Sequence, residues 1–302
     1  MSATKGAADV AGASSGATPA DPAGRTLLLG TISLDHYLAS GDVLPGGGIL
    51  NMAWHWRQRL GRPFRLLTRV GEDGQPVEAF LARHGIEVAS PADLAAPGRS
   101  SSIDIEIQPD RQPHMDNFVG GVWDDYRLTT TERAALARAE RLHAVLVEGA
   151  ISELARLAQE GALVDLTVSA DFLGVRHYTV ERLATTMGHV DLGFIGWPGA
   201  EDAPEVAGMR AVAFDLERVL VVTMGARSVW VFDGPARSER RHAVSPVEVE
   251  GTTLGCGDAY IAWHLDALWR GASHDEAVRQ GMIGGALATA WGRPLPDDAY
   301  AP

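Results

Sequence analysis

A glycine-rich turn stands directly before a helix-like apolar segment near the end of the chain, in the stretch "TTLGCGDAY" from Thr252 to Tyr260. The first turn of a helix exposes unpaired N–H groups and the positive end of the helix dipole, and glycines let an anion approach the backbone closely. The amides of Gly255, Cys256 and Gly257 therefore form a candidate anion hole for a phosphoryl group in transfer. Asp258, directly behind them, could accept a proton from an attacking hydroxyl.

The same turn also has an interpretation without chemistry. A Gly-Asp pair before a helix is often only a turn whose aspartate caps the helix. Cys256 is either a small passive residue or, as the alternative, a reactive thiol. The residues around the turn leave both alternatives open, so the rest of the chain must decide between them.

The elements that must position this turn alternate between strand and helix. Short apolar runs typical of buried strands occupy 25–35, 64–71, 162–171, 190–197 and 218–225, and helical patterns occupy 46–61 and 75–85. This alternation predicts an α/β fold with a mostly parallel central sheet. Segments 228–234 and 240–249 indicate antiparallel strands, and 257–271 and 273–292 indicate two closing helices.

Two parts of the chain fall outside this pattern. Residues 100–112 alternate apolar and polar side chains, which indicates a strand with one wet face in a small β-flap. We expect lid segments at about 36–46 and 99–127. Residues 1–24 are rich in Ala, Gly, Ser and Pro, and they cannot bury enough apolar surface to offset the entropy of ordering. They predict a disordered tail, which leaves 25–302 as one domain.

Composition excludes several classes of protein. The net charge of -13 excludes a nucleic-acid partner, which would need a basic face. No apolar run approaches the ~18 residues of a membrane span, so no membrane partner is expected. A single cysteine forbids an internal disulfide and fits a cytoplasmic protein. The ten histidines form no His-Glu-x-x-His and no paired Cys/His set, so a zinc site is not predicted.

Four motifs occur in an order that resembles the ribokinase-like (PfkB) carbohydrate kinases. They are "GGGILN", "TRVGEDG", "VTMG" and "TTLGCGDAY", and the resemblance spans roughly 25–294. It implies a three-layer αβα domain with a small β-flap as its lid, and an ATP-dependent sugar kinase with Mg²⁺. By this resemblance Asp258 is the general base, which deprotonates a primary hydroxyl. A non-catalytic sugar- or nucleotide-binding protein on the same fold is the alternative.

The acceptor side of the resemblance lies in the early motif. Gly46, Gly47 and Asn51 match residues that bind sugar hydroxyls in the family, and Asp35 matches an aspartate that also holds the sugar. The residues themselves agree, because a carboxylate at the carboxyl end of a parallel strand points into the ligand crevice. We place Asp35 at the end of the first strand.

The nucleotide side matches the family less completely. Thr223 and Gly225 match a motif that lies along ATP, while Ser228 replaces its last glycine. The family's Asn-x-x-Glu, which helps to hold magnesium, lacks its asparagine here, and Glu201 is the nearest candidate ligand. The family also uses an aspartate for a monovalent cation. Thr252 stands in its place, so we expect potassium to activate weakly or not at all.

The segment 117–132 resembles the fructoselysine 6-kinase branch of the family. That branch implies a glycated amino acid as the substrate, with the stretch 123–126 covering the sugar and with Asp124 and Asp125 facing the amine of its tail. A free sugar is the other acceptor, and ribokinase, fructokinase and nucleoside kinase activities all stay open. The resemblance also allows a homodimer formed through the lid.

Overall fold

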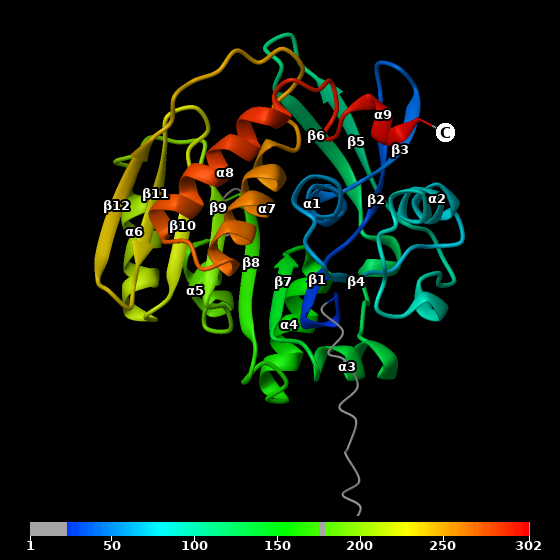
Figure 1. Ribbon diagram of the computed structural model, residues 1–302, viewed down its shortest axis with the longest axis horizontal. Helices are drawn as coiled ribbons and strands as arrows, with labels where there is room; N and C mark the ends of the chain where they lie inside the picture. The colour runs from blue at the N-terminus through cyan, green and yellow to red at the C-terminus, as the bar shows by residue number, and fades with distance from the viewer. Residues whose placement is uncertain (1–22, 175–178, 302) are drawn as a thin grey trace, which may run out of the picture.

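The computed structural model describes residues 23–174 and 179–301, and it contains two sheets (Figure 1). The large sheet has the order β12-β11-β10-β9-β8-β7-β1-β4. Its strands are β1 (Thr26–Leu29), β4 (Arg65–Leu67), β7 (Arg141–Val145), β8 (Thr167–Gly174), β9 (Leu192–Gly196), β10 (Val219–Thr223), β11 (Ser228–Asp233) and β12 (Ser238–Ala243). All pairs from β10 to β4 are parallel, and β11 and β12 add an antiparallel edge. The predicted α/β fold is confirmed.

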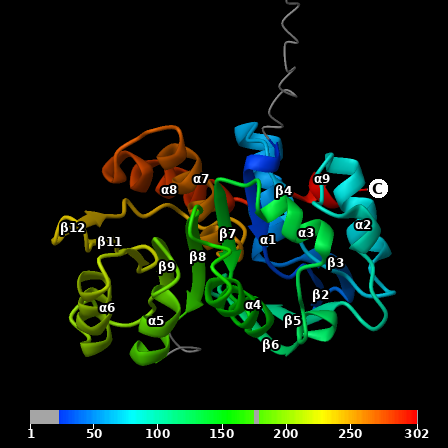
Figure 2. The same ribbon diagram turned by 90° about the horizontal axis from the view of Figure 1, so that it is seen from below.

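Helices cover both faces of the large sheet (Figure 2). One face carries α1 (Gly48–Trp54), α7 (Cys256–Trp269) and α8 (His274–Ala288), and the other carries α4 (Glu148–Gln159), α5 (Val180–Met187) and α6 (Pro204–Asp215). The shorter helices are α2 (Gln75–His84), α3 (Thr130–Leu136) and α9 (Asp297–Tyr300), with single turns η1 (Ala23–Arg25), η3 (Pro91–Asp93) and η4 (Gly121–Trp123), and η2 (His55–Leu60) continues α1. None of the helices in the described ranges is both long and apolar enough to cross a bilayer.

The two faces of the sheet build two separate apolar cores. Leu27 and Leu29 belong to the core under α4, α5 and α6, while Leu28 between them belongs to the core under α1 and α7. Side chains of a strand point alternately to the two faces, so a strand covered on both sides must be apolar throughout. This explains why the parallel strands appear in the sequence as continuous apolar runs.

The second sheet is the predicted β-flap, which we call the lid sheet. It has the order β3-β2-β5-β6, with β2 (Ser33–Tyr37), β3 (Asp42–Gly46), β5 (Ser101–Ile107) and β6 (Pro113–Val119). The placement of Asp35 at the end of the first strand was wrong. The run 25–35 divides after β1, and Asp35 lies in the middle of β2, which pairs with β3 and β5 rather than with the large sheet.

The aromatic side chains of the segment before α3 can be compared with their prediction. Trp123 and Tyr126 stack at 4.0 Å between ring centroids, and both are buried in the core under α4, so the expectation that they cover the sugar was wrong. Trp123 donates its indole N–H to the carbonyl of Arg69, which fixes it there. The predicted tail lies outside the described residues, except that Ala23 and Gly24 belong to η1.

Candidate active site

The glycine-rich turn shapes the start of α7 as an open backbone surface. Gly255 precedes the helix at φ 82, in the left-handed region that favours glycine, and a Cβ there would press on Pro294. Gly257 is exposed, and a Cβ added to it would meet nothing within 4 Å. The Cys256 amide, which we expected to be free, instead donates to the carbonyl of Thr253 at 3.2 Å. Of the three amides predicted to form the anion hole, those of Gly255 and Gly257 therefore remain candidates, and that of Cys256 does not.

Asp258 meets Asn51 across the packing of α1 against α7. The Nδ2 of Asn51 donates to Oδ2 of Asp258 at 2.7 Å, although 207 positions separate the two residues in the chain. Asn51 is 3% exposed, and its Oδ1 is buried with no partner in the described part of the chain. Buried amides seldom leave an acceptor unsatisfied, so this oxygen is free to accept a hydrogen bond from a ligand.

Asp35 is brought into the same site by glycines of the early motif. Its Oδ1 accepts a hydrogen bond from the Ser33 hydroxyl at 2.5 Å. A Cβ at Gly46 would overlap the Asp35 carboxylate, and one at Gly48 would lie 2.9 Å from Oδ1 of Asp258. Gly47 adopts φ 96 at the start of α1. The missing side chains of these glycines therefore leave the space that both carboxylates use.

Asp171 is a third carboxylate of this site, and it was not among the residues predicted from the sequence. It lies in β8 opposite Val145 of β7, is 5% exposed, and accepts a hydrogen bond from the Leu173 amide at 2.8 Å. The signal was present, because an apolar strand that ends in an aspartate at the carboxyl edge of a parallel sheet marks a ligand crevice. The same pattern led to the prediction of Asp35, which lies in the other sheet, and not to that of Asp171.

The charge of Asp258 raises the proton affinity of the two other carboxylates. Burial raises the pKa of Asp258 to about 6, and the hydrogen bond from Asn51 opposes this rise. Burial also raises the pKa of Asp35 and of Asp171 to about 7, and in both cases the negative charge of Asp258 adds to the rise. Two carboxylates that sense the charge of a third lie close to it. The structure thus gathers Asp35, Asp171 and Asp258 into one electrostatic cluster.

Cys256 takes no part in this cluster as a nucleophile. Burial, followed by the charge of Asp258, raises the pKa of its thiol to about 12. A thiol with so high a pKa stays protonated at neutral pH and is a poor nucleophile. This favours the interpretation of Cys256 as a passive residue.

The tip of the lid sheet rests on the loop that leads into α7. The Thr252 hydroxyl donates to the carbonyl of Arg111 at 2.9 Å, and the Thr253 amide donates to the same carbonyl at 3.1 Å. Leu254 packs with Tyr37 and Ile105 of the lid sheet in a small apolar cluster. Thr252 therefore fastens the turn between β5 and β6 to the candidate anion hole, in the position where the family pattern has an acidic residue.

The nucleotide-side residues lie at the same edge of the large sheet. Thr223 ends β10, two strands away from Asp171 in β8, and its carbonyl accepts from the Trp197 amide at 2.8 Å. Gly225 follows at φ 59, and a Cβ there would meet nothing within 4 Å. The turn after β10 thus presents an open backbone beside the carboxylate cluster.

Glu201 is engaged by protein side chains. Arg241 donates to its two carboxylate oxygens at 2.8 and 2.9 Å, and the Ser228 hydroxyl donates at 2.6 Å. The hydrogen bond from Arg241 is the main cause that lowers the pKa of Glu201 to about 2. Within residues 23–174 and 179–301, no group of three or more His, Cys, Asp or Glu side chains is placed to hold a metal ion.

Solved structures share this fold. The Burkholderia thailandensis nucleoside kinase in complex with inosine matches with 18% identity and a TM-score of 0.69, over 89% of this chain and 92% of that one. The Arabidopsis thaliana ribokinase complexed with ribose and ATP matches with 17% identity and a TM-score of 0.70, over 91% and 96%. The Schistosoma mansoni adenosine kinase in complex with 2-fluoroadenosine matches with 12% identity and a TM-score of 0.73, over 90% and 97%.

The comparison of sequences gives the family. A search among curated proteins found no match. The profile of the pfkB family carbohydrate kinases matches residues 33–290, which include the lid sheet, Asn51, Asp171 and the turn before α7. This match covers most of the chain, and the ribokinase-like fold agrees with it. The chain belongs to the pfkB family of carbohydrate kinases.

Proposed function

We propose that this protein transfers the γ-phosphate of ATP to a primary hydroxyl of a sugar, with Asp258 as the general base. The observation that carries the proposal is the position of the Asp258 carboxylate. It lies at the open start of α7 and is held by Asn51, and no cationic side chain of the described residues pairs with it. A pKa of about 6 leaves it ionised at neutral pH and still able to accept a proton.

The acceptor would lie against Asp35, Gly46, Gly47 and Asn51. The unpartnered Oδ1 of Asn51 can accept a hydrogen bond from a sugar hydroxyl, and its Nδ2 fixes the base. As the hydroxyl oxygen bonds to the γ-phosphorus, its proton passes to Asp258 and the bond to the ADP oxygen breaks. The open amides of the Gly255–Gly257 turn would hold the charge that develops on the phosphoryl oxygens.

ATP would lie along Thr223 and Gly225, at the open turn after β10. Asp171 fits a magnesium ligand better than Glu201 does, since one of its carboxylate oxygens is unengaged and it adjoins Asp258. Mg²⁺ is usually bound by one or two carboxylates together with substrate phosphates, and it neutralises phosphate charge. The Arabidopsis ribokinase complex with ribose and ATP supports ATP as the donor.

A nucleoside is the second candidate acceptor. The fold neighbours include a nucleoside kinase complexed with inosine and an adenosine kinase complexed with 2-fluoroadenosine. The glycated amino acid, the lid homodimer, the cytoplasmic location and the weak potassium response remain predictions from the sequence. A non-catalytic binding protein stays the rival from another class, and Asp258 argues against it because binding alone needs no base.

An ATP-consumption screen separates these functions. Purified protein is tested with free sugars, nucleosides and glycated amino acids, and each positive is repeated with Asp258→Asn. We expect turnover with one of these classes and its loss in the variant. Tight binding of a sugar or nucleoside without any ATP consumption would favour the binding protein instead.

A further inference from the structure

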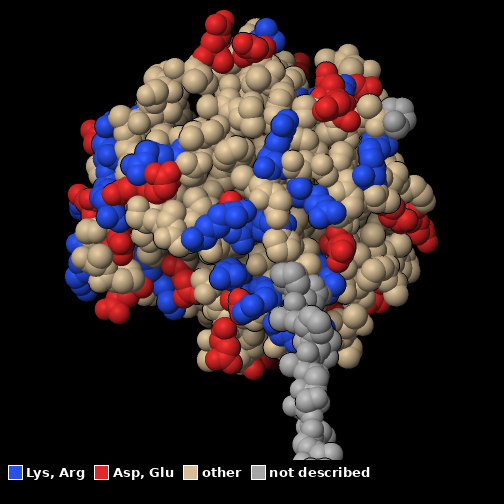
Figure 3. Space-filling model, in the orientation of Figure 1, with Lys and Arg blue, Asp and Glu red and all other residues tan. Residues whose placement is uncertain are grey.

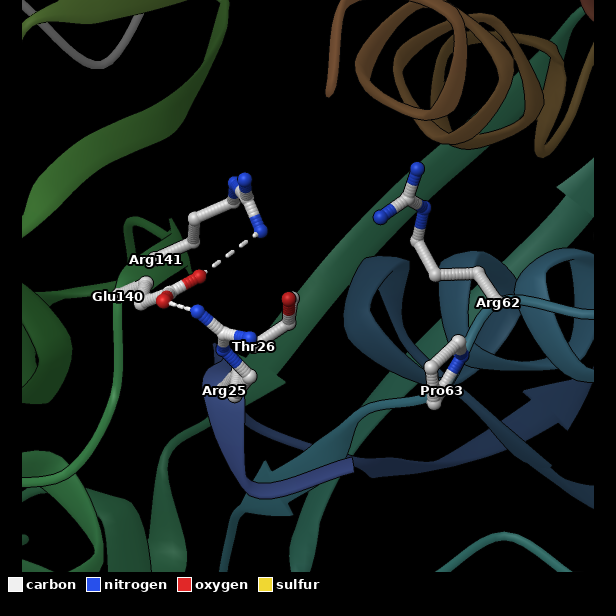
Figure 4. A pocket seen from close by; sticks show the side chains of 6 residues that line it. All are labelled: Arg25, Thr26, Arg62, Pro63, Glu140 and Arg141. Atoms are coloured by element: carbon white, nitrogen blue, oxygen red, sulfur yellow. Dashed lines mark ion pairs between the residues drawn. The ribbon is translucent and has the colours of Figure 1, made fainter. Parts of the chain in front are cut away.

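A cavity lies at the amino ends of β1 and β7, the opposite edge of the sheet from Asp171. Its volume is about 310 Å³, and it is lined by Arg25, Thr26, Arg62, Pro63, Glu140 and Arg141 (Figure 4). Figure 4 shows the Arg62 side chain on one side of it, and Arg25, Glu140 and Arg141 on the other. The lining is therefore polar and dominated by guanidinium groups.

The positive charges of this arginine cavity exceed the negative ones. Arg25 pairs with Glu140, and Nη1 of Arg141 lies 3.6 Å from the same carboxylate, so one anion serves two cations. Arg62 pairs with Asp266 of α7 at 2.7 Å, but Asp266 also pairs with Arg270 at 2.9 Å. In a chain with a net charge of -13, this is a local excess of cations. Figure 3 shows basic side chains gathered in the middle and lower part of one face of the molecule.

The cations are also held in place. The Arg62 side chain is only 10% exposed, and its guanidinium carbon lies 5.4 Å from the Trp269 ring centroid. The Arg141 guanidinium carbon lies 5.8 Å from the same centroid. Burial, together with the charges of Arg270 and Arg141, lowers the pKa of Arg62, while Asp266 opposes this. Fixed cations that repel one another are stabilised by an anion between them.

We propose that this cavity binds a small phosphate-bearing anion at a site separate from the active site. Guanidinium groups present N–H donors in a planar fork that matches a phosphate group, and arginine is favoured where phosphate is recognised. The volume is at the lower end of the ~300–1,000 Å³ of ligand pockets, so inorganic phosphate or a phosphorylated sugar fits better than a nucleotide. Glu140 competes with such an anion for Arg25 and Arg141.

Calorimetric titration of the full chain with inorganic phosphate and with ribose 5-phosphate tests the site. Gly257→Asp is used as the background, because it places a carboxylate in the candidate anion hole and blocks phosphate there. We expect binding to persist in that background and to weaken about tenfold or more in Arg141→Gln, as the loss of one charge-assisted contact implies. Arg25→Gln gives the same test if Arg141→Gln fails to fold.

Two further variants sharpen the result. Glu140→Gln removes the competing carboxylate, so it should strengthen binding several-fold, opposite to the arginine variants. Arg237→Gln removes an exposed cation at the turn between β11 and β12, and it should change nothing. The tighter binder of inorganic phosphate and ribose 5-phosphate shows whether the cavity takes the free ion or a sugar phosphate. Absence of binding in the Gly257→Asp background, or equal losses in Arg141→Gln and Arg237→Gln, would overturn the proposal.

Discussion

The two ends of the candidate active site treat their carboxylates in opposite ways. Asp35, Asp171 and Asp258 form no ion pair within the described part of the chain, and burial raises the pKa of each. Glu201, on the nucleotide side, is paired with Arg241, and its pKa falls. Burial without a cation makes a carboxylate costly to ionise and raises its pKa, whereas a hydrogen bond from an arginine favours the ionised form and lowers the pKa.

This difference separates the carboxylates that are available for catalysis from the one that is held in an ion pair. Perturbed carboxylates in a cluster are candidates for catalysis, although structural ion pairs can also shift a pKa. Here the structural pair and the unpaired cluster are cleanly separated. We therefore expect function to depend strongly on the unpaired carboxylates and weakly on the paired one.

The largest expected effect is at Asp258. Asp258→Asn keeps the shape of the side chain and removes its ability to accept a proton, so kcat should fall by about 10²- to 10⁴-fold. Acceptor binding, measured by calorimetry, should change little. Asp165→Asn, at an exposed position, is the matched control. Near wild-type turnover in Asp258→Asn would show that Asp258 is not the general base and serves only to bond Asn51.

The next effect compares Asp171 directly with Glu201. Asp171→Asn should raise the Mg²⁺ concentration needed for half-maximal rate by at least about tenfold, because a lost metal contact typically has this size. Glu201→Gln breaks an ion pair at the protein surface, and such pairs contribute little, so its rate should stay within a few-fold of wild type. If Glu201→Gln shifted the Mg²⁺ dependence more than Asp171→Asn does, Glu201 rather than Asp171 would be the magnesium ligand.

The sequence could predict the local features of this site and not the contacts between distant positions. Motif spacing was enough to identify the turn before α7 and the glycines around Asn51, because their backbone requirements are local. The place of Asp35 was wrong, since nothing local distinguishes one long strand from two strands in different sheets. The contact of Thr252 with Arg111 joins positions 141 apart, and no local pattern could reveal it.

A smaller effect concerns stability and pH. The folded chain binds protons at Asp35 and Asp171 more tightly than the unfolded chain does, because their pKa rises from 3.8 to about 7. The stability that they contribute is fully present below about pH 4 and is lost as the pH rises through about 7. One unit of pKa shift is worth about 1.4 kcal/mol, so between pH 5 and 8 these two groups together should remove several kcal/mol from the stability of ligand-free protein.

Asp171→Asn checks this assignment by denaturant unfolding at several pH values. It should flatten the loss of stability between pH 5 and 8, and it should be more stable than wild type at pH 8. Glu201→Gln should keep the wild-type slope in this range, because the pKa of Glu201 lies near 2. A stability difference between Asp171→Asn and wild type that does not grow as the pH rises from 5 to 8 would contradict the direction of the Asp171 pKa shift.

The smallest effect concerns Thr252, where the lid meets the catalytic turn. Thr252→Val removes the hydroxyl that donates to the Arg111 carbonyl, and a hydrogen bond of this kind contributes about 0.5–1.5 kcal/mol. The lid would close less firmly over the acceptor, so KM for the acceptor should rise up to about tenfold while kcat stays nearly constant. Thr185→Val, on the exposed side of α5, is the control.

Thr252 also predicts the potassium response, because a threonine that bonds to the lid supplies no carboxylate for a cation. At fixed ionic strength, replacing a bulky organic cation by potassium should leave the wild-type rate nearly unchanged. A strong potassium-specific increase would mean that other oxygens of this loop bind the ion, and that Thr252 does more than hold the lid.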